Sequence, residues 1–215
     1  EHVMGGLLVL ARRFDRTLAA QRQKRWIQNE LTDDWPWTLH GRRMTVVGLG
    51  TIGIEVAKRA HAFGVHVTGV RRRTDEQRPP FVERIVGPDR LNEALTGSDI
   101  VVLSAPAVAA TQRIIGGEQL ALLSRGAILV NVARGQIVDE SAMRRALESG
   151  QLGGAVLDVF EREPLESSSP LWSLPNVVIT PHTAGASQHR AHRNIRRFID
   201  NLPRYRNGTP LEGVV

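Results

Sequence analysis

Residues 44–53 read MTVVGLGTIG, and this stretch decides the fold. The apolar run at 44–47 has the length and the β-branched side chains of a buried strand. It leads directly into a Gly-x-Gly-x-x-Gly turn at 48–53, and 54–63 is typical of an amphipathic helix. The expected buried stripe of this helix consists of Ile52, Val56, Ala60 and Phe63. A strand, a glycine-rich turn and a helix in this order predict a dinucleotide site, although glycine-rich turns also occur for structural reasons alone.

Each glycine of the turn has a physical role. Gly48 allows the tight turn, Gly50 lets a pyrophosphate approach the backbone, and Gly53 lets the helix pack closely on the strand. The unpaired N–H groups at the start of the helix, where Thr51 and Ile52 lie, favour the phosphates. We therefore take all five residues as candidate cofactor-binding residues.

The second strand, expected at 66–70, ends where the usual NAD pattern has an acidic residue for the ribose hydroxyls. This sequence has Arg71 there, followed by Arg72 and Arg73. A guanidinium cannot accept a hydrogen bond from a hydroxyl, but it pairs bidentately with a 2′-phosphate. The sequence therefore predicts NADP rather than NAD as the cofactor, with Arg71 and Arg72 in the site. The alternative interpretation is a solvated arginine-rich turn.

Composition limits the classes of protein. The 215 residues are 41% hydrophobic, include no cysteine and carry a formal net charge of +6. Such a chain can bury a real core, and without cysteine it has no disulfide, iron–sulfur cluster or cysteine zinc site, so we expect no metal. No apolar run reaches the ~18 residues of a membrane span, and nothing is typical of a signal peptide; we expect a cytoplasmic protein with no membrane partner. The arginines are scattered without interleaved aromatic residues, which argues against nucleic acid.

Further strands and helices alternate along the chain. The expected strands lie at 81–86, 99–103, 127–131, 154–158 and 177–180. The expected helices lie at 89–95, 140–149 and 187–201, with short helical pieces at 111–115 and 118–123. This alternation predicts an α/β fold with a doubly wound parallel sheet, the Rossmann arrangement, over 41–186. Residues 187–215 form a C-terminal helix and tail in this interpretation.

The N-terminal residues 1–40 are expected to form a linking helix and a tryptophan-containing arm. Apolar residues recur at helical spacing from the start, at Val3, Leu7, Leu10, Phe14 and Leu18. Trp26, Trp35 and Trp37 follow in an irregular segment. Three exposed indoles are costly, so we expect them either against a partner surface or in the core.

Ligands of a doubly wound sheet bind beyond the carboxyl ends of its strands. The residues at those ends include Ser104, Ala105, Pro106, Val132, Ala133, Arg134, Asp158, Glu163, His182, Ala184 and Gly185. Reduction of a carbonyl requires a guanidinium that polarises it or grips an adjacent carboxylate, an imidazole that gives a proton, and a carboxylate that orients the imidazole. Arg134, Glu163 and His182 supply these three groups. Taken singly, each has a structural alternative: a carbonyl contact, a surface acid or a helix cap.

Three stretches together carry a resemblance. LVNVARGQIVD at 129–139, AVLDVFEREPL at 155–165 and VITPHTAG at 178–185 closely resemble the signatures of the D-isomer-specific 2-hydroxyacid dehydrogenases, and the glycine turn precedes them in the family's order. The resemblance implies that Arg134 binds and activates the substrate, that Glu163 pairs with the histidine, and that His182 exchanges the proton. It also implies roles for residues of the cofactor site. Asp158 would lie near the nicotinamide carboxamide, the backbone of Val132 and Ala133 beside the nicotinamide, and Ser104, Ala105, Pro106 and Thr111 along the groove.

The sequence departs from the family pattern in two places. Arg71 replaces the usual acid, as in the family's NADP-using glyoxylate and hydroxypyruvate reductases. The family's N-terminal substrate lobe is absent from these 215 residues, so we expect them to bind NADP(H) but to turn over a 2-oxo acid poorly. The first helix and the tryptophan segment occupy the place where family members dimerise, which predicts a homodimer. A nucleotide-sensing module without turnover, similar to the family's corepressor relatives, is the alternative, and the particular acid stays open.

Overall fold

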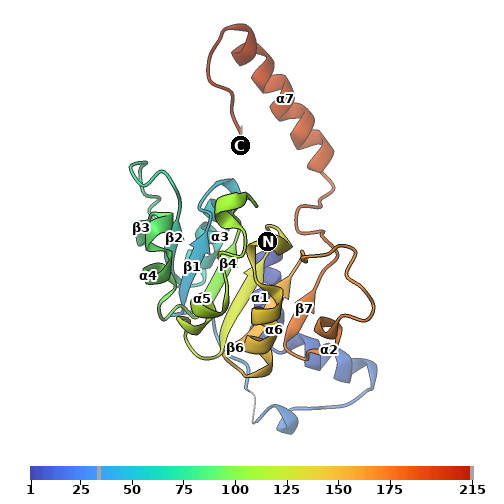
Figure 1. Ribbon diagram of the computed structural model, residues 1–215. Helices are drawn as coiled ribbons and strands as arrows, with labels where there is room; N and C mark the ends of the chain where they lie inside the picture. The colour runs from blue at the N-terminus through green and yellow to red at the C-terminus, as the bar shows by residue number, and fades with distance from the viewer. Residues whose placement is uncertain (33–34, 214–215) are drawn as a thin grey trace. The chain divides into compact units, whose positions relative to one another are not determined.

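The structure is a computed structural model that describes residues 1–32 and 35–213 (Figure 1). The chain forms two compact units, Glu1–His182 and Thr183–Val215. The first unit contains the whole sheet, and the second contains one long helix, α7 (Arg190–Arg206). The predicted domain boundaries at 40/41 and 186/187 stay a prediction.

A seven-stranded sheet forms the centre of the first unit, and every neighbouring pair of strands is parallel. The strands are β1 (Arg43–Val47), β2 (His66–Val70), β3 (Arg84–Val86), β4 (Ile100–Leu103), β5 (Ala127–Asn131), β6 (Leu152–Leu157) and β7 (Val177–Ile179). Their order in the sheet is β3-β2-β1-β4-β5-β6-β7. The strand order reverses between β1 and β4, which is the switch point of a doubly wound fold. The predicted fold class is confirmed.

Helices cover both faces of this sheet (Figure 1). They are α1 (His2–Ala11), α3 (Thr51–Ala62), α4 (Leu91–Leu95), α5 (Gly117–Ala121) and α6 (Glu140–Glu148), whereas α2 (Phe14–Arg22) packs on α1. Alternate residues of each strand point to opposite faces. Met44 and Val46 of β1 therefore join a core with α1 and α3, whereas Val47 joins a second core with α4, α5 and α6. With both faces covered, β4 at the centre of the sheet is apolar throughout, and its neighbours β1 and β5 are mostly apolar.

The N-terminal helix is shorter than predicted. Trp37 N donates to the carbonyl of Ala11 at 2.8 Å, and Arg13 takes a left-handed conformation with φ of 55°. The returning chain thus occupies the carbonyl that would continue the helix, and the direction changes before α2. The expected stripe fails beyond this break, because Phe14 and Leu18 are exposed.

The predicted stripe of the helix after the glycine turn is also partly wrong. Ile52 is 55% exposed and Phe63 is 44% exposed, whereas Val56 and Ala60 are buried. The helix begins at Thr51, so Ile52 lies in its first turn, and Phe63 is the residue after its last turn. Both therefore lie beyond the part of α3 that packs on the sheet.

Two smaller expectations are corrected, and the tryptophans divide between the two alternatives. The strand expected at 81–86 is only Arg84–Val86, and the helical piece expected at 111–115 is a single 3-10 turn, Ala109–Thr111. The indoles of Trp26 and Trp35 are exposed, but Trp37 packs on the core of α1 and α3, with the Arg42 guanidinium 5.3 Å from its ring centre. Among the residues described, no helix is long and apolar enough to span a membrane.

Candidate active site

The glycine turn packs directly on the end of β4. Gly48 has a φ of 97°, and a Cβ at this position would lie 2.4 Å from the backbone nitrogen of Ala105. Ser104 Oγ donates to the Gly48 carbonyl at 2.8 Å. A Cβ at Gly53 would lie 2.3 Å from that same carbonyl oxygen. The first and third glycines are therefore required by contacts within the protein, at the switch point of the sheet.

Gly50 differs, because a Cβ there would meet nothing within 4 Å. It is the N-cap of α3, and no side chain caps this helix or places an acid in its first turn. The N–H groups of the first turn thus lie beside open space with the positive end of the helix dipole. This arrangement fits the pyrophosphate of a dinucleotide, with Gly50, Thr51 and Ile52 around it.

Arg71 follows β2 at the same edge of the sheet. Its side chain is 10% exposed, with Nη1 3.2 Å from Oε2 of Glu76 and Nη2 donating to the Glu76 carbonyl at 2.6 Å. Arg73 Nη1 lies 3.1 Å from Oε1 of the same carboxylate. Arg72 is exposed. Arg71 is therefore not part of a solvated turn, whereas Arg72 and Arg73 face water.

Thr111 shapes the loop after β4. Its hydroxyl donates to the Pro106 carbonyl at 2.7 Å and accepts from Val108 N at 2.9 Å. Ala105 is buried and Pro106 is exposed. The two hydrogen bonds of Thr111 therefore fix the conformation of this loop beside the glycine turn.

Asn131 at the end of β5 holds the turn that carries Arg134. The Asn131 side chain donates to the Arg134 carbonyl at 2.9 Å and accepts from Ala133 N at 3.0 Å. Arg134 Nη1 donates to the Ala133 carbonyl at 2.6 Å, while its side chain stays exposed. Val132 is half-buried against the core of α1 and α3. The backbone of this turn is thus fixed by a buried amide that the sequence analysis did not single out.

Gly135 brings this turn into backbone contact with the loop after β6. A Cβ at Gly135 would lie 1.9 Å from the carbonyl carbon of Phe160. Phe160 N in turn donates to Oε1 of Glu163 at 3.0 Å. Arg134 and Glu163 are therefore carried by two segments that meet with no room for a methyl group between them.

Glu163 and His182 form a direct pair. His182 Nδ1 lies 2.7 Å from Oε2 of Glu163, and both side chains are partly exposed. Burial raises the pKa of Glu163, but the hydrogen bonds from His182 and Phe160 and the charges of His182 and Arg134 outweigh it and lower the pKa below its ordinary value. An ionised Glu163 accepts from Nδ1–H, which leaves Nε2 as the nitrogen that exchanges a proton.

Asp158 and Thr180 hold the backbone of this histidine. His182 N donates to the carbonyls of Asp158 and Thr180 at 2.9 and 3.1 Å, in a left-handed conformation with φ of 53°. The Thr180 hydroxyl donates to Oδ1 of Asp158 at 2.6 Å and lies 3.0 Å from Nε2 of His2. A hydroxyl has one hydrogen, so His2 donates to Thr180. The carboxylate of Asp158 is 1% exposed, at the base of the site.

The structure brings some of the predicted site residues together and not others. The structure joins Glu163 to His182, places Arg134 close enough for its charge to act on Glu163, and packs Gly48 on Ser104 and Ala105. Ala184 and Gly185 belong to the second unit. The sequence analysis missed His2, Asn131 and Thr180. Thr180 had a signal, since it is a hydroxyl residue at a strand end two residues before the histidine.

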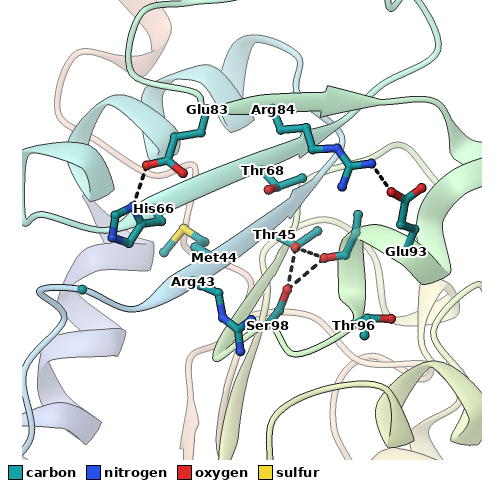
Figure 2. A pocket seen from close by; sticks show the side chains of 12 residues that line it. Arg43, Met44, Thr45, His66, Thr68, Glu83, Arg84, Glu93, Thr96 and Ser98 are labelled. Carbon is teal, nitrogen blue, oxygen red and sulfur yellow. Dashed lines mark hydrogen bonds and ion pairs between the residues drawn. The ribbon is translucent and has the colours of Figure 1, made fainter.

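A hollow of about 370 Å³ lies at the amino ends of the strands, opposite the candidate active site (Figure 2). Its lining includes Arg43, His66 and Arg84, the first residues of β1, β2 and β3. Figure 2 shows His66 paired with Glu83, and Arg84 with Glu93. Hydrogen bonds from Arg90 and Arg84 lower the pKa of Glu93 to about 2. The hollow lies away from the carboxyl ends of the strands and is separate from the site described above.

A doubly wound sheet, a glycine turn at its switch point and a convergent histidine, carboxylate and arginine define the nicotinamide-dependent dehydrogenases. More narrowly, residues 4–184 match the family described as D-isomer specific 2-hydroxyacid dehydrogenase, NAD binding domain, and the chain belongs to this family. The resemblance seen in the sequence is thus confirmed, and the chain is a NAD(P)-binding domain.

Three relatives illustrate the match. The D-3-phosphoglycerate dehydrogenase of Methanocaldococcus jannaschii is 36% identical over 100% of this chain and 40% of the relative. The glyoxylate reductase of Korarchaeum cryptofilum is 40% identical over 80% of this chain and 51% of the relative. The glyoxylate/hydroxypyruvate reductase B of Serratia proteamaculans is 36% identical over 99% of this chain and 65% of the relative. The chain thus spans 40% to 65% of the length of these curated relatives.

Solved structures give the same result. A D-isomer specific 2-hydroxyacid dehydrogenase from Xanthobacter autotrophicus Py2, in complex with NADPH and MES, has a TM-score of 0.84 and 36% identity, covering 100% of this chain and 85% of that one. An NADPH-dependent glyoxylate/hydroxypyruvate reductase from Sinorhizobium meliloti, with NADP and sulfate, has a TM-score of 0.84 and 30% identity, covering 100% and 66%. All five proteins are named as dehydrogenases or reductases, and none supports the corepressor alternative.

Proposed function

We propose that this chain is the cofactor-binding part of an NADP(H)-dependent oxidoreductase that interconverts a small 2-oxo acid, such as glyoxylate or hydroxypyruvate, and its 2-hydroxy acid. The single observation that carries the proposal is the hydrogen bond between His182 and Glu163, with the charge of Arg134 acting on the same carboxylate. Relatives named as glyoxylate or hydroxypyruvate reductases support the substrate class.

The residues of the chain divide the work of the reaction. When bound, the nicotinamide supplies or accepts the hydride. Arg134 grips the substrate carboxylate and polarises the neighbouring carbonyl. His182 gives its Nε2 proton to the carbonyl oxygen during reduction and takes it back during oxidation, while Glu163 keeps the imidazole oriented and stabilises its charged form.

The cofactor would lie along the carboxyl edge of the sheet. Gly48, Gly50, Thr51, Ile52 and Gly53 would hold the pyrophosphate. The further residues proposed for the cofactor site are Arg71, Arg72, Ser104, Ala105, Pro106, Thr111, Val132, Ala133, Asp158, Ala184 and Gly185. Solved relatives that contain NADPH or NADP support the choice of the phosphorylated cofactor.

We further propose a homodimer formed through residues 1–40 and a cytoplasmic location. The exposed indoles of Trp26 and Trp35 support the dimer, because tryptophan is enriched where two protein surfaces meet. Light scattering at micromolar concentration tests it, and a monomer contradicts it.

Binding and turnover test the function separately. Calorimetry should show NADPH binding to the 215-residue chain, with NADH weaker. Arg71→Ala should weaken NADPH by about 10- to 100-fold, the value of a charge-assisted contact, and leave NADH unchanged. Arg144→Ala is the matched control, because Arg144 lies on α6 in an i,i+4 pair with Glu148.

Turnover of glyoxylate and hydroxypyruvate is then followed by NADPH absorbance. We expect it to be slow with these residues alone. A robust kcat from the 215-residue chain would refute the division of labour with a separate substrate lobe, and a clear NAD preference would refute the choice of cofactor.

A further inference from the structure

We propose that Glu76 is a built-in competitor for the 2′-phosphate of NADP(H), and so a specificity-determining residue. This inference rests on the proposed function, which places the 2′-phosphate at Arg71. It adds that the protein already holds an anion of its own in that place.

Glu76 contacts the two arginines in the way that a bound phosphate group would. Its two carboxylate oxygens are divided between two guanidinium groups, Oε2 at 3.2 Å from Arg71 and Oε1 at 3.1 Å from Arg73. A carboxylate bridging two arginines satisfies the same N–H donors that a phosphoryl group would use. The Glu76 carbonyl adds a third contact, accepting from Arg71 Nη2 at 2.6 Å.

The position of Arg71 makes this contact matter. Its side chain is nine-tenths buried at the end of β2, while Arg73 is 83% exposed. A nearly buried guanidinium needs a counter-charge, because leaving it without one costs desolvation energy. Glu76 supplies that charge when no cofactor is bound.

Arg71 also has a donor to spare. Its Nε is buried and has no hydrogen-bond partner among the residues that the structure describes. Glu76 therefore satisfies the guanidinium only in part. A phosphate has more acceptor oxygens and more negative charge than a carboxylate, so it can replace Glu76 and pair more fully with the same arginine.

The exchange affects the two cofactors differently. NADPH must displace Glu76 from at least one arginine, and its affinity is lowered by the strength of that pair. NADH carries a 2′-hydroxyl without charge, so it leaves the pair intact. The other acids between β2 and β3 are Asp75, which is exposed, and Glu83, which pairs with His66. Glu76 thus reduces the preference for NADPH over NADH that Arg71 creates.

The test uses adenosine 2′,5′-bisphosphate and 5′-AMP, which occupy the adenosine side of the site without the nicotinamide. Glu76→Gln should tighten the bisphosphate by about 3- to 10-fold, the range for two partly exposed pairs, and leave 5′-AMP unchanged. Glu148→Gln is the matched control, because Glu148 has the same exposure, 44% against 45%, and also pairs with an arginine.

A mutant cycle removes the ambiguity of a single variant. In a background with both Arg71→Ala and Arg73→Ala, Glu76→Gln should no longer tighten the bisphosphate, since both guanidinium groups that pair with Glu76 are gone. Weaker or unchanged binding in Glu76→Gln, or equal tightening in Glu148→Gln, would overturn the proposal. If the unmodified chain itself fails to prefer the bisphosphate over 5′-AMP, the proposed NADP function fails instead, which separates the two results.

Discussion

The imidazole of His182 and the carboxylate of Glu163, 19 residues apart in sequence, are joined by a 2.7 Å hydrogen bond between Nδ1 and Oε2. The bond leaves the histidine with one nitrogen for the substrate. It also ties the two loops that follow β6 and β7 at the edge of the sheet where the glycine turn lies. The proposed proton transfer depends on this pair.

Replacing His182 with Gln should abolish proton transfer while preserving the site. In an enzyme form that includes a substrate lobe, we expect kcat to fall by about 10²- to 10⁴-fold, the value of a general acid, with NADPH affinity unchanged. Steady-state kinetics and calorimetry measure the two effects. Retention of kcat would show that another group supplies the proton.

Glu163→Gln should reveal a pH-dependent contribution to stability. The pKa of Glu163 is lowered from its ordinary value of 4.5, so the folded state binds its proton less readily than the unfolded state. The contribution is complete above pH 4.5 and is lost as the pH falls through the lowered pKa. Because the pair is partly exposed, we expect Gln to cost about 0.5 kcal/mol at pH 7 and less at pH 3. Urea unfolding at both pH values tests this, and an equal loss at both contradicts it.

Alanine at Gly48 should lower stability, whereas alanine at Gly50 should lower cofactor affinity. At Gly48 a Cβ would clash with Ala105 and the φ is positive, so Gly48→Ala should lower the free energy of unfolding by about 2–3 kcal/mol. At Gly50 a Cβ enters open space, so Gly50→Ala should keep its stability and weaken NADPH and NADH alike. Thermal unfolding and calorimetry compare the variants. Unchanged cofactor affinity in Gly50→Ala would place the pyrophosphate elsewhere.

Thr180→Val should destabilise the base of the site. It removes the hydroxyl that donates to Asp158 and accepts from His2, and leaves the nearly fully buried carboxylate with one hydrogen bond fewer. We expect a loss of about 1–3 kcal/mol in the free energy of unfolding. Thr180→Ser keeps the hydroxyl and is the control. A loss as large in Ser, which keeps the hydroxyl, as in Val would show that the hydroxyl's hydrogen bonds do not account for the destabilisation.

The sequence predicted the sheet well where the strands are continuous apolar runs. The strand at 127–131 has the predicted bounds, because an apolar segment buried on both faces is recognisable from its residues alone. The first helix was not predicted correctly, since its end depends on Trp37 returning to bond Ala11, a contact between residues distant in sequence. Helical periodicity carries no information about such a contact.

The residues proposed for catalysis could be singled out in the sequence because each follows a strand and carries a side chain with distinctive chemistry. Their supports could not. Asn131 and His2 act through single hydrogen bonds to groups that only the fold brings near them. The Arg71–Glu76 pair likewise spans a loop with no periodic pattern. The charge of Arg71 singled it out in the sequence, but nothing in the sequence indicated that Glu76 forms an ion pair with it.

The contact at Gly135 has a mechanical consequence. Since the segment that carries Arg134 abuts the Phe160 backbone without a side chain between them, neither can slide without pushing the other. The segment that carries Arg134 and the loop that carries Glu163, to which His182 is hydrogen-bonded, thus behave as one rigid unit. Any rearrangement that displaces the guanidinium relative to the imidazole–carboxylate pair must first separate the two backbones at Gly135.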